Sequence, residues 1–282
     1  MLKIFLIIGA FYVGLVFLLF IFQRNILFVP DRSKPNLTDS NVPEMSEVNI
    51  ETKDGLTLLS WFYRGQAEKP VIIYFQGNAG NISDRDYKAR FLIDNGFSVL
   101  LMGYRGYGGN QGQPSEEGLK SDGEAALAFA AKEGFKTTDI ILYGESLGTG
   151  VVVNLGISSE FRGLILEAPY TSIEALAKKR YWFIPVGLLL RDKFDSINKV
   201  SQLNSPTLVI HGDADKVIKM DYGRQLYEGI PQPKKFITFP GGGHSNLFDF
   251  GAGTEIATFM IEKTIKITIA IKISGLRVGC PN

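Results

Sequence analysis

The fold is decided by the stretch from Ile140 to Gly148, which reads IILYGESLG. Its opening apolar run is short and continuous, which is typical of a strand buried on both faces. The glycines on either side of Ser146 permit a very tight turn, because a residue without Cβ lets backbones approach closely. The stretch therefore predicts a strand, a sharp turn that presents the Ser146 hydroxyl, and a helix over Leu147–Ile157. The alternative is a glycine-rich helix start that Ser146 caps.

Similar apolar runs recur along the chain and alternate with stretches of helical spacing. The predicted strands are Val71–Phe75, Ser98–Met102, Ile140–Tyr143, Leu164–Leu166, Thr207–Ile210 and Phe236–Phe239. The predicted helices include Asp86–Asp94, Leu119–Lys132, Leu147–Ile157 and Tyr222–Tyr227. Before them, a β-hairpin is expected around Asp54-Gly55, between Glu47–Thr52 and Leu56–Tyr63. This order predicts an α/β fold with a mostly parallel central sheet and helices on both faces.

A catalytic base and an acid are available where later strands end. In such a sheet the ligand crevice lies beyond the carboxyl ends of the strands, and a serine hydroxyl needs a base to become a nucleophile. His244 follows the last apolar run in the sequence PGGGHS, on a glycine-rich loop suited to presenting an imidazole. His211 ends a strand directly before Gly212, so we expect it to pack inside the structure.

Two aspartates could orient the imidazole of His244. Asp213 and Asp215 both follow the strand that ends near His211, and the residue pattern does not separate them. Either could instead cap the helix that follows. With either one, the chain order is serine, aspartate, histidine, which is the order expected of this type of fold.

Backbone N–H groups are expected to stabilise the oxyanion that forms on a substrate. One should come from Leu147, directly after the serine. The other should come from the loop after Val71–Phe75, which reads QGNAGN, with Asn78 as the first choice and Ala79 as the next. The alternative is an ordinary strand–helix turn, where glycine and asparagine are common.

Composition excludes several other classes of function. The chain has 30 Lys plus Arg against 29 Asp plus Glu, so no electrostatic field favours nucleic acid. The one cysteine, Cys280, cannot form an internal disulfide, and with two histidines the sequence offers no Cys/His metal cluster. We expect no cofactor, no metal and no obligate protein partner.

The amino-terminal segment has the pattern of a membrane anchor. Ile4–Phe22 is 19 residues long without a charge or a proline, so as a helix it would reach roughly 28 Å, close to the thickness of a bilayer's hydrocarbon core. It lacks a small-residue cleavage site, which favours a retained anchor over a signal peptide. We expect single-pass membrane localisation. The flanking basic residues nearly balance, so the positive-inside rule assigns no orientation.

Taken together, these motifs resemble the α/β-hydrolase superfamily, and more narrowly its small membrane-anchored abhydrolases of the bud-emergence type. That group carries an HGNAGN loop, a DYRGYGxSxGxPSE segment, the G-x-S-x-G turn, and HGxxDxV before a GxH. The matching segments here are Gln76–Asn81, Gly103–Glu116, Gly144–Gly148 and His211–Val217. The resemblance covers roughly Val29 to Lys263.

The resemblance implies roles for particular residues. Ser146 is expected to be the nucleophile, Asp215 the acid and His244 the base, so the family pattern selects Asp215 where the residues alone did not. Gln76 replaces the usual histidine, while Gly103 and Asn110 replace the usual aspartate and serine; these departures concern loop geometry and substrate preference. The loop Tyr104–Gly108 is expected to be structural, and Ser115 to start a helix with Gly118.

These expectations divide the chain into segments. Residues 1–25 form the anchor, 26–45 a linker and 46–263 the hydrolase domain. Within it, residues 170–204 form a short helical cap with apolar helices at Ile173–Lys179 and Ile184–Leu190, or else a packed insertion without substrate contact. The tail 264–282 includes isoleucines that alternate as in a strand, which is consistent with an edge strand, a disordered tail or a frameshifted end.

The expected function is hydrolysis of carboxylic esters or thioesters through an acyl-enzyme, on a small-molecule, lipid or acyl-protein substrate. A peptidase or amidase with the same residues is one alternative. A non-catalytic binding module held at the membrane is the other.

Overall fold

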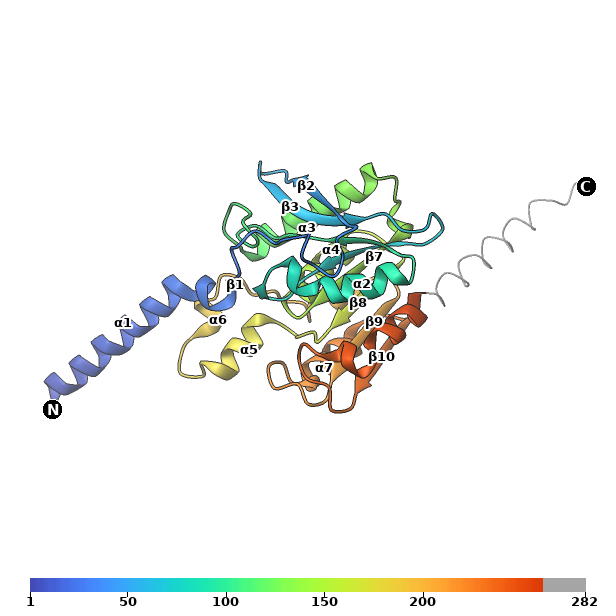
Figure 1. Cartoon of the computed structure of the whole chain (residues 1–282). Coiled ribbons are helices and arrows are strands. Elements are labelled where there is room, and N and C mark those ends of the chain that lie inside the picture. Colours follow the sequence, from blue (N-terminus) through green and yellow to red (C-terminus); the bar gives the residue numbers. More distant parts are fainter. Residues whose placement is uncertain (261–282) are drawn as a thin grey trace, which may run out of the picture.

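An eight-stranded sheet runs through the middle of the computed structural model, which describes residues 1–260 of the chain (Figure 1). In spatial order the strands are β10 (Lys234–Phe239), β9 (Thr207–Gly212), β8 (Gly163–Glu167), β7 (Ile140–Glu145), β4 (Val71–Phe75), β6 (Ser98–Leu101), β3 (Thr57–Tyr63) and β2 (Ser46–Glu51). The six strands from β10 to β6 are parallel, and the hairpin β2–β3 joins antiparallel. The mostly parallel sheet and the hairpin around Asp54-Gly55 are confirmed. The alternating tail 264–282 lies outside the described residues.

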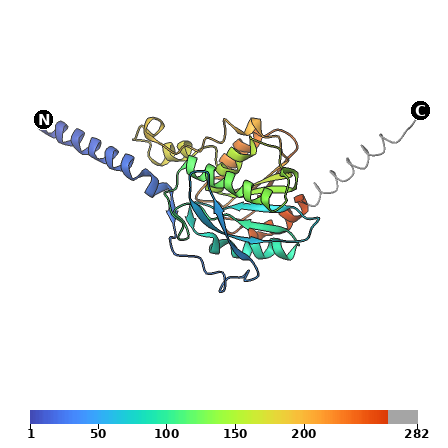
Figure 2. The ribbon, with the colours of Figure 1, turned by 90° about the horizontal axis from the view of Figure 1, so that it is seen from above.

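Helices cover both faces of this sheet, as Figures 1 and 2 show. One face packs against α3 (Glu116–Lys132), α4 (Leu147–Gly156) and α7 (Met220–Gly229), and the other against α2 (Asp86–Asp94) and a helical segment over residues 252–260. Successive residues of β4 alternate between the two cores, because neighbouring side chains of a strand point to opposite faces. Both faces are apolar, so the strands read as continuous hydrophobic runs.

Helix α3 begins three residues before the predicted Leu119. Ser115 caps it: its Oγ accepts a hydrogen bond from the Gly118 N–H at 3.0 Å. A side-chain oxygen at this position satisfies one of the amides that a helix start leaves without a partner. The expected helix start at Ser115 and Gly118 is therefore confirmed.

The strand order reverses between β4 and β7. The chain leaves β4 toward β6 on one side, and the strands after β7 continue on the other. Ligand crevices of open α/β sheets lie beyond the carboxyl ends of the strands at such a point. The loop after β4 carries Asn78, and Ser146 follows β7 directly, so both predicted contributors lie at this crevice.

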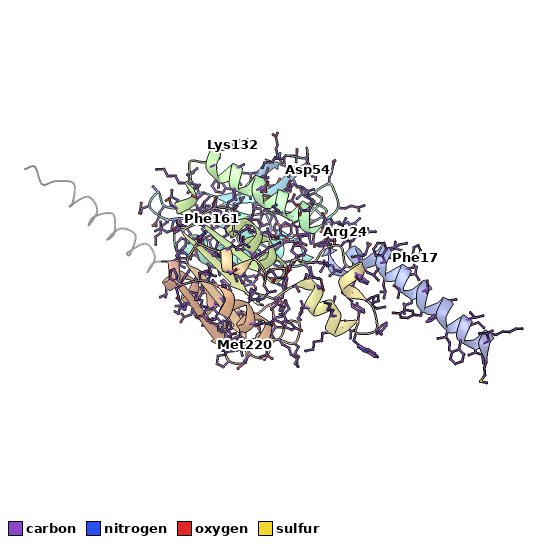
Figure 3. All side chains as sticks on the ribbon, turned by 180° about the vertical axis from the view of Figure 1, so that it is seen from behind. Phe17, Arg24, Asp54, Lys132, Phe161 and Met220 are labelled. Atoms are coloured by element: carbon purple, nitrogen blue, oxygen red, sulfur yellow. The ribbon has the colours of Figure 1, made fainter. Side chains whose placement is uncertain are left out.

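The helical cap is present between β8 and β9. It consists of α5 (Ile173–Arg180) and α6 (Val186–Leu189), joined by an apolar loop. Ahead of the sheet, α1 (Leu2–Leu27) is long and apolar enough to cross a membrane. Figure 3 shows Arg24 where α1 meets the body of the molecule and Phe17 farther out along the helix.

The segment after α1 is fastened to the body. Its short strand β1 (Val29–Pro30) pairs in parallel with β5 (Ala79–Gly80), in the loop that follows β4. Val42 and Met45 are buried against the sheet. The base of α1 is therefore joined through β1 to the loop that carries Asn78.

Gly103 and Asn110, two departures from the family pattern, both pack against the backbone of Leu59. A Cβ added at Gly103 would lie 2.0 Å from the carbonyl oxygen of Leu59 and 2.9 Å from the side-chain nitrogen of Asn110. The Asn110 amide instead bonds Leu59, accepting from its N–H at 2.7 Å and donating to its carbonyl at 3.2 Å. An aspartate at position 103 would require that backbone to shift. Asn110 thus supplies the polar side chain that Gly103 lacks.

Candidate active site

The turn at Ser146 is as sharp as the glycine pattern predicts. Ser146 has φ 51° and ψ −115°, in the left-handed half of the backbone map. A Cβ at Gly148 would lie 2.1 Å from the carbonyl oxygen of Phe75, and one at Gly144 would lie 2.5 Å from that of Gly148. Only glycine fits this packing, which explains the G-x-S-x-G spacing. The Ser146 N–H donates to the carbonyl of Glu167 at 2.9 Å and ties the turn to β8.

Three residues from distant parts of the chain form one hydrogen-bonded series. His244 Nε2 lies 3.0 Å from Ser146 Oγ, and His244 Nδ1 lies 2.7 Å from Asp215 Oδ2. With its proton on Nδ1, the imidazole donates to the carboxylate and can accept the serine proton. Ser146 and Asp215 are nearly buried, whereas the His244 side chain is 17% exposed. The structure therefore brings together the three side chains expected from the sequence.

The structure also separates the two aspartates. Asp213 Oδ1 accepts a hydrogen bond from the Gly241 N–H at 2.7 Å, so it holds the glycine-rich loop rather than the imidazole. Asp215 Oδ1 accepts from the N–H groups of Val217 and Ile218 at 2.8 and 2.9 Å, which leaves Oδ2 for His244. Asp215 is the residue that orients His244.

His211 packs inside the structure and also lies against Asp215. It is fully buried, with Nε2 2.9 Å from the Ile218 carbonyl and 3.3 Å from Asp215 Oδ2. Burial would by itself raise the pKa of Asp215, but the contacts with His211 and His244 outweigh it and hold that pKa well below its usual range. The carboxylate is therefore charged when it faces His244.

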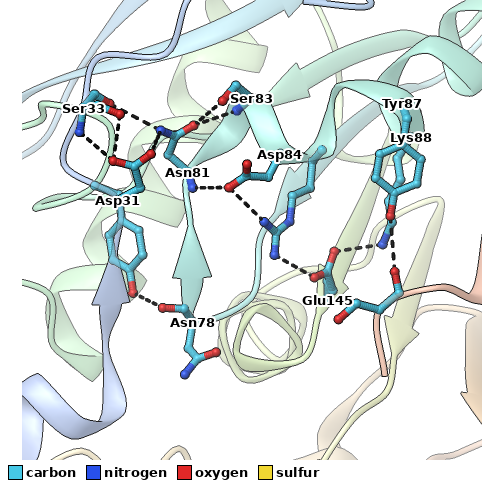
Figure 4. Close-up of polar contacts among 12 residues, drawn as sticks. Asp31, Ser33, Asn78, Asn81, Ser83, Asp84, Tyr87, Lys88 and Glu145 are labelled. Atoms are coloured by element: carbon cyan, nitrogen blue, oxygen red, sulfur yellow. Dashed lines mark hydrogen bonds and ion pairs between the residues drawn. The ribbon is translucent and has the colours of Figure 1, made fainter. Parts of the chain in front are cut away.

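The loop after β4, which carries Asn78 (Figure 4), is held from two sides. The Tyr107 hydroxyl donates to the Asn78 carbonyl at 2.9 Å, as does the Val29 N–H, also at 2.9 Å. The Asn78 side chain donates to the Leu27 carbonyl at 3.0 Å, at the end of α1. Tyr104 supports the same loop through the Gln76 carbonyl at 3.2 Å. The aromatic residues of the Tyr104–Gly108 segment thus fix the loop after β4.

A second polar cluster lies directly under the turn. Lys88 Nζ is 2.8 Å from Glu145 Oε2 and 2.8 Å from Glu167 Oε2, and Arg85 contacts Glu145 at 2.9 Å. The hydroxyls of Tyr74 and Tyr143 donate to Glu145 and Glu167 respectively. Burial would by itself raise the pKa of Glu145, but Lys88 and Arg85 outweigh it and hold that pKa well below its usual range.

An apolar cavity of about 410 Å³ opens at Ser146. Its floor includes Ser146, Leu147 and Asn78, and its walls come from the cap and from the carboxyl-terminal half of α1. The wall residues are Val16, Leu19, Phe20, Gln23, Ile26 and Leu27 of α1 and Ile173, Leu176, Ala177, Arg180, Tyr181, Ile184, Val186, Leu189 and Leu190 of the cap, together with Tyr170 and Val217. The cap therefore contacts the space above Ser146. In residues 1–260, no group of three or more His, Cys, Asp or Glu side chains is placed to hold a metal ion.

The sequence profile of a known family matches most of this structure. The family described as "Serine aminopeptidase, S33" matches residues 66–191 and 189–250. The chain belongs to the α/β-hydrolase superfamily. The hydrolase is 33% identical over 236 residues to an uncharacterised Mycobacterium tuberculosis protein, which covers 83% of this chain and 84% of that one.

Two further comparisons extend this result. The human alpha/beta hydrolase domain-containing protein 17B is 34% identical over 226 residues, covering 77% of the hydrolase and 75% of that protein. The structure of the Pyrococcus furiosus esterase Pf2001 matches with a TM-score of 0.66 at 19% identity and covers 84% of this chain and 99% of that one. That likeness shows the fold.

The sequence reasoning missed the cluster around Lys88. Lys88 on α2 and Arg85, directly before α2, look like ordinary charged residues of a helix surface. A signal was present in the strands, because Glu145 and Glu167 end two apolar runs that are neighbours in the sheet and lie directly opposite each other. Two carboxylates buried side by side require cations. The hydrolase supplies Lys88 from α2 and Arg85 from the 3₁₀ helix Ile82–Arg85 that precedes it.

Proposed function

We propose that this protein is a membrane-anchored serine hydrolase that cleaves carboxylic ester or thioester bonds in lipid-like or acylated substrates. The observation that carries the proposal is the series Ser146–His244–Asp215, which lies at the floor of an apolar cavity. A serine becomes a nucleophile at neutral pH when an oriented imidazole can take its proton. The coarser conclusion, an α/β-hydrolase of esterase type, rests on the family and the related folds.

In the proposed mechanism, Ser146 Oγ attacks the substrate carbonyl carbon while His244 Nε2 takes the hydroxyl proton. The Asp215 carboxylate stabilises the imidazolium that forms. The tetrahedral intermediate collapses when its bond to the leaving alcohol or thiol breaks and His244 returns the proton to that group. His244 then takes a proton from water, the resulting hydroxide attacks the acyl-enzyme, and the acid leaves as Ser146 regains its proton.

The oxyanion of each tetrahedral intermediate would accept hydrogen bonds from backbone N–H groups of Leu147 and Asn78. Leu147 is the first residue of α4, and the first N–H groups of a helix have no partner within that helix. Both residues line the cavity beside Ser146. The contacts of Asn78 with Leu27, Val29 and Tyr107 hold its loop in place before a substrate binds, which favours electrostatic stabilisation of the transition state.

The lining of the cavity favours an acyl chain as the group bound above Ser146. Aliphatic and aromatic side chains dominate it, and Arg180 is its one charged residue in the described part of the chain. A peptidase of amino-terminal residues would need a carboxylate to bind the substrate's ammonium group, and none of these lining residues carries one. The cavity therefore favours esters and thioesters over peptides, although the family description names an aminopeptidase.

Helix α1 is proposed to anchor the hydrolase as a single membrane span. Its 26 residues would extend about 39 Å, which exceeds the hydrocarbon thickness of a bilayer. A cleaved signal sequence would have the same composition, but the end of α1 lines the cavity and pairs with the cap. A helix that forms part of the substrate cavity is expected to be retained.

Labelling with a fluorophosphonate probe tests the proposed nucleophile. The folded wild-type protein should label, Ser146→Ala should not, and Ser115→Ala should label like the wild type. A folded wild-type protein that does not label would contradict the enzyme and favour a binding module. Nitrophenyl esters of rising chain length should then be cleaved faster than peptide anilides.

A further inference from the structure

The loop at the tip of the cap is uncharged between two basic groups of residues. Residues 181–190 read YWFIPVGLLL. Lys178, Lys179 and Arg180 precede this stretch, and Arg191, Asp192 and Lys193 follow it. Of the five basic residues, Lys178 and Lys193 form ion pairs with Glu174, so the net charge of the flanks stays positive but is reduced. An apolar stretch between positive flanks matches the interface of a bilayer, where basic side chains meet lipid phosphates and apolar side chains enter the acyl region. We call residues 181–190 the cap tip.

The cap tip lies alongside α1. The Tyr12 hydroxyl donates to the carbonyl of Phe183 at 2.8 Å, and the Gln23 side chain donates to that of Leu189 at 3.3 Å. At the base of the cap, Arg24 forms two hydrogen bonds with Asp192, at 2.7 and 3.1 Å. Figures 1 and 2 both show the cap beside the half of α1 that is nearer the body. The contacts span residues 12 to 24 of the helix, or about 18 Å along its axis.

Large apolar side chains of the cap tip face away from the protein. Trp182 is 82% exposed and Leu188 is 87% exposed. Between the cap tip and α1 lies a second apolar crevice of about 310 Å³, lined by residues such as Val13, Phe17 and Pro185. A water-soluble protein seldom exposes so much apolar surface in one place, and such patches mark membrane or protein interfaces.

The position of these contacts fixes the depth of the cap tip relative to α1. If Phe22 and Gln23 mark the edge of the hydrocarbon, Tyr12 lies about 16 Å farther along the helix, near the midplane of a bilayer whose hydrocarbon core is roughly 30 Å thick. Phe183 contacts Tyr12 and so must reach a similar depth. Arg191, whose backbone N–H donates to the Gln23 side chain at 2.8 Å, would then lie at the level of the lipid headgroups, together with Arg24.

We propose that the cap tip is inserted into the same leaflet as the carboxyl-terminal half of α1, so that the cavity above Ser146 opens into lipid and receives its acyl chain from the membrane. The inference rests on the proposed anchoring role of α1, and its last clause rests on the proposed hydrolysis. Phe20 and Leu27, two residues of α1 that line the cavity, would then guide the acyl chain toward Ser146.

Tryptophan fluorescence tests the insertion without any assay of activity. The chain has two tryptophans, Trp61 and Trp182, and Trp61 is fully buried in the body. The difference between the spectra of the wild type and Trp182→Phe therefore reports Trp182. The full-length protein is reconstituted in phosphatidylcholine–phosphatidylglycerol vesicles with and without bromine on the acyl chains. We expect the Trp182 signal to be blue-shifted, strongly quenched by the bromines and weakly quenched by aqueous acrylamide.

Either of two other results would overturn the insertion. Strong quenching by acrylamide with none by bromine would place the cap tip in water. A signal protected from both quenchers would mean that protein, such as a second copy of the chain, covers the cap tip. The signal that remains in Trp182→Phe is the internal control, since buried Trp61 should respond to neither quencher.

A kinetic comparison tests uptake of the substrate from the membrane. The double variant Trp182→Asp/Leu188→Asp changes two exposed side chains that do not line the cavity. Turnover of a long-chain ester embedded in vesicles should fall about tenfold or more, because charged residues oppose insertion, while turnover of a short, water-soluble ester stays unchanged. Equal turnover of the embedded ester by variant and wild type would refute lateral uptake. Failure of the wild type to cleave either ester would refute the proposed hydrolysis and leave the quenching result standing.

Discussion

Two polar clusters meet at the Ser146 turn, and they differ in their access to solvent. The series Ser146–His244–Asp215 reaches the cavity, with 17% of the His244 side chain exposed. The cluster of Lys88, Glu145 and Glu167 includes the residue directly before Ser146, and it is closed, since the Lys88 side chain is 1% exposed. Both contain carboxylates with cationic or imidazole partners.

The difference in access fits the reactive role proposed for the first cluster and a structural role for the second. In the proposed reaction, a proton would pass between Ser146, His244 and a bound substrate. In the closed cluster, two carboxylates face Lys88 and Arg85, so the charges balance. The closed cluster holds the ends of β7 and β8 together, and the Glu167 carbonyl accepts the N–H of Ser146. We therefore expect changes in the first cluster to affect turnover and changes in the second to affect stability.

The largest effect is expected for Ser146→Ala. If Ser146 is the nucleophile, kcat should fall on the order of 10⁵- to 10⁶-fold. The melting temperature should stay nearly constant, because alanine keeps the backbone bond to Glu167. As a control, Ser115→Ala removes the cap of α3 and should cost about 0.5–2 kcal/mol of stability while turnover persists. Substantial activity in Ser146→Ala would remove the distinction between the two clusters.

The next largest effect is expected for Asp215→Asn. An amide can no longer hold the imidazole in the tautomer that accepts the serine proton, so kcat should fall about 10⁴-fold. Asp213→Asn is the matched control, since Asp213 contacts the Gly241 N–H and an amide oxygen can still accept that bond. Steady-state kinetics of both variants decide the matter. Equal losses of kcat in the two variants would mean that Asp213 and Asp215 act through the geometry of their loop rather than through His244.

Substitutions in the closed cluster should lower the stability of the fold. Lys88→Met leaves buried carboxylates without their shared cation, which should lower the free energy of unfolding by about 3–5 kcal/mol. Denaturant unfolding measures this loss. Lys132→Met, on the exposed end of α3, should stay within about 0.5 kcal/mol of the wild type. A loss of turnover in Lys88→Met without any loss of stability would place Lys88 in the reactive series.

Acid should reduce the difference in the free energy of unfolding between Lys88→Met and the wild type. The folded-state pKa of Glu145 lies below its usual value of 4.5, so its contribution to stability is present above that pH and is lost as the pH falls. In Lys88→Met, protonation of the carboxyls instead removes part of the penalty of burying them. Unfolding measured at about pH 7 and about pH 4 should therefore show a smaller difference at the lower pH. A difference that grows in acid would mean that Lys88 does not stabilise these carboxylates.

The smallest effect is expected for His211→Gln. His211 Nε2 lies 3.3 Å from Asp215 Oδ2, which is a long contact, and donates to the Ile218 carbonyl at 2.9 Å. Loss of a hydrogen bond to a charged group costs about 1.5 kcal/mol at the low end, so kcat should fall roughly tenfold. His211→Gln should lower kcat and leave KM unchanged if His211 positions Asp215. A change in stability alone would make it a packing residue.

The sequence predicted most of the fold because its signals are local. The apolar runs set the strands, the Asp54-Gly55 turn set the hairpin, and the glycines around Ser146 follow from contacts within one strand–turn–helix unit. The boundaries were less certain: α3 starts at Glu116, where the cap residue Ser115 places it. The cluster around Lys88 was not predicted, since helix spacing alone made Lys88 and Arg85 resemble surface residues.

By itself, the sequence determined the α/β layering, the sharp turn at Ser146 and a helix long enough to span a bilayer, because each depends on neighbouring residues. The residues by themselves left Asp213 and Asp215 open, and only the family resemblance favoured Asp215; the tertiary structure shows that Asp215 faces His244, and it alone decided that Lys88 is buried. Likewise, only the folded chain shows that α1 forms a wall of the cavity above Ser146. These outcomes depend on distances between segments that are far apart in the chain, and local pattern carries no information about such distances.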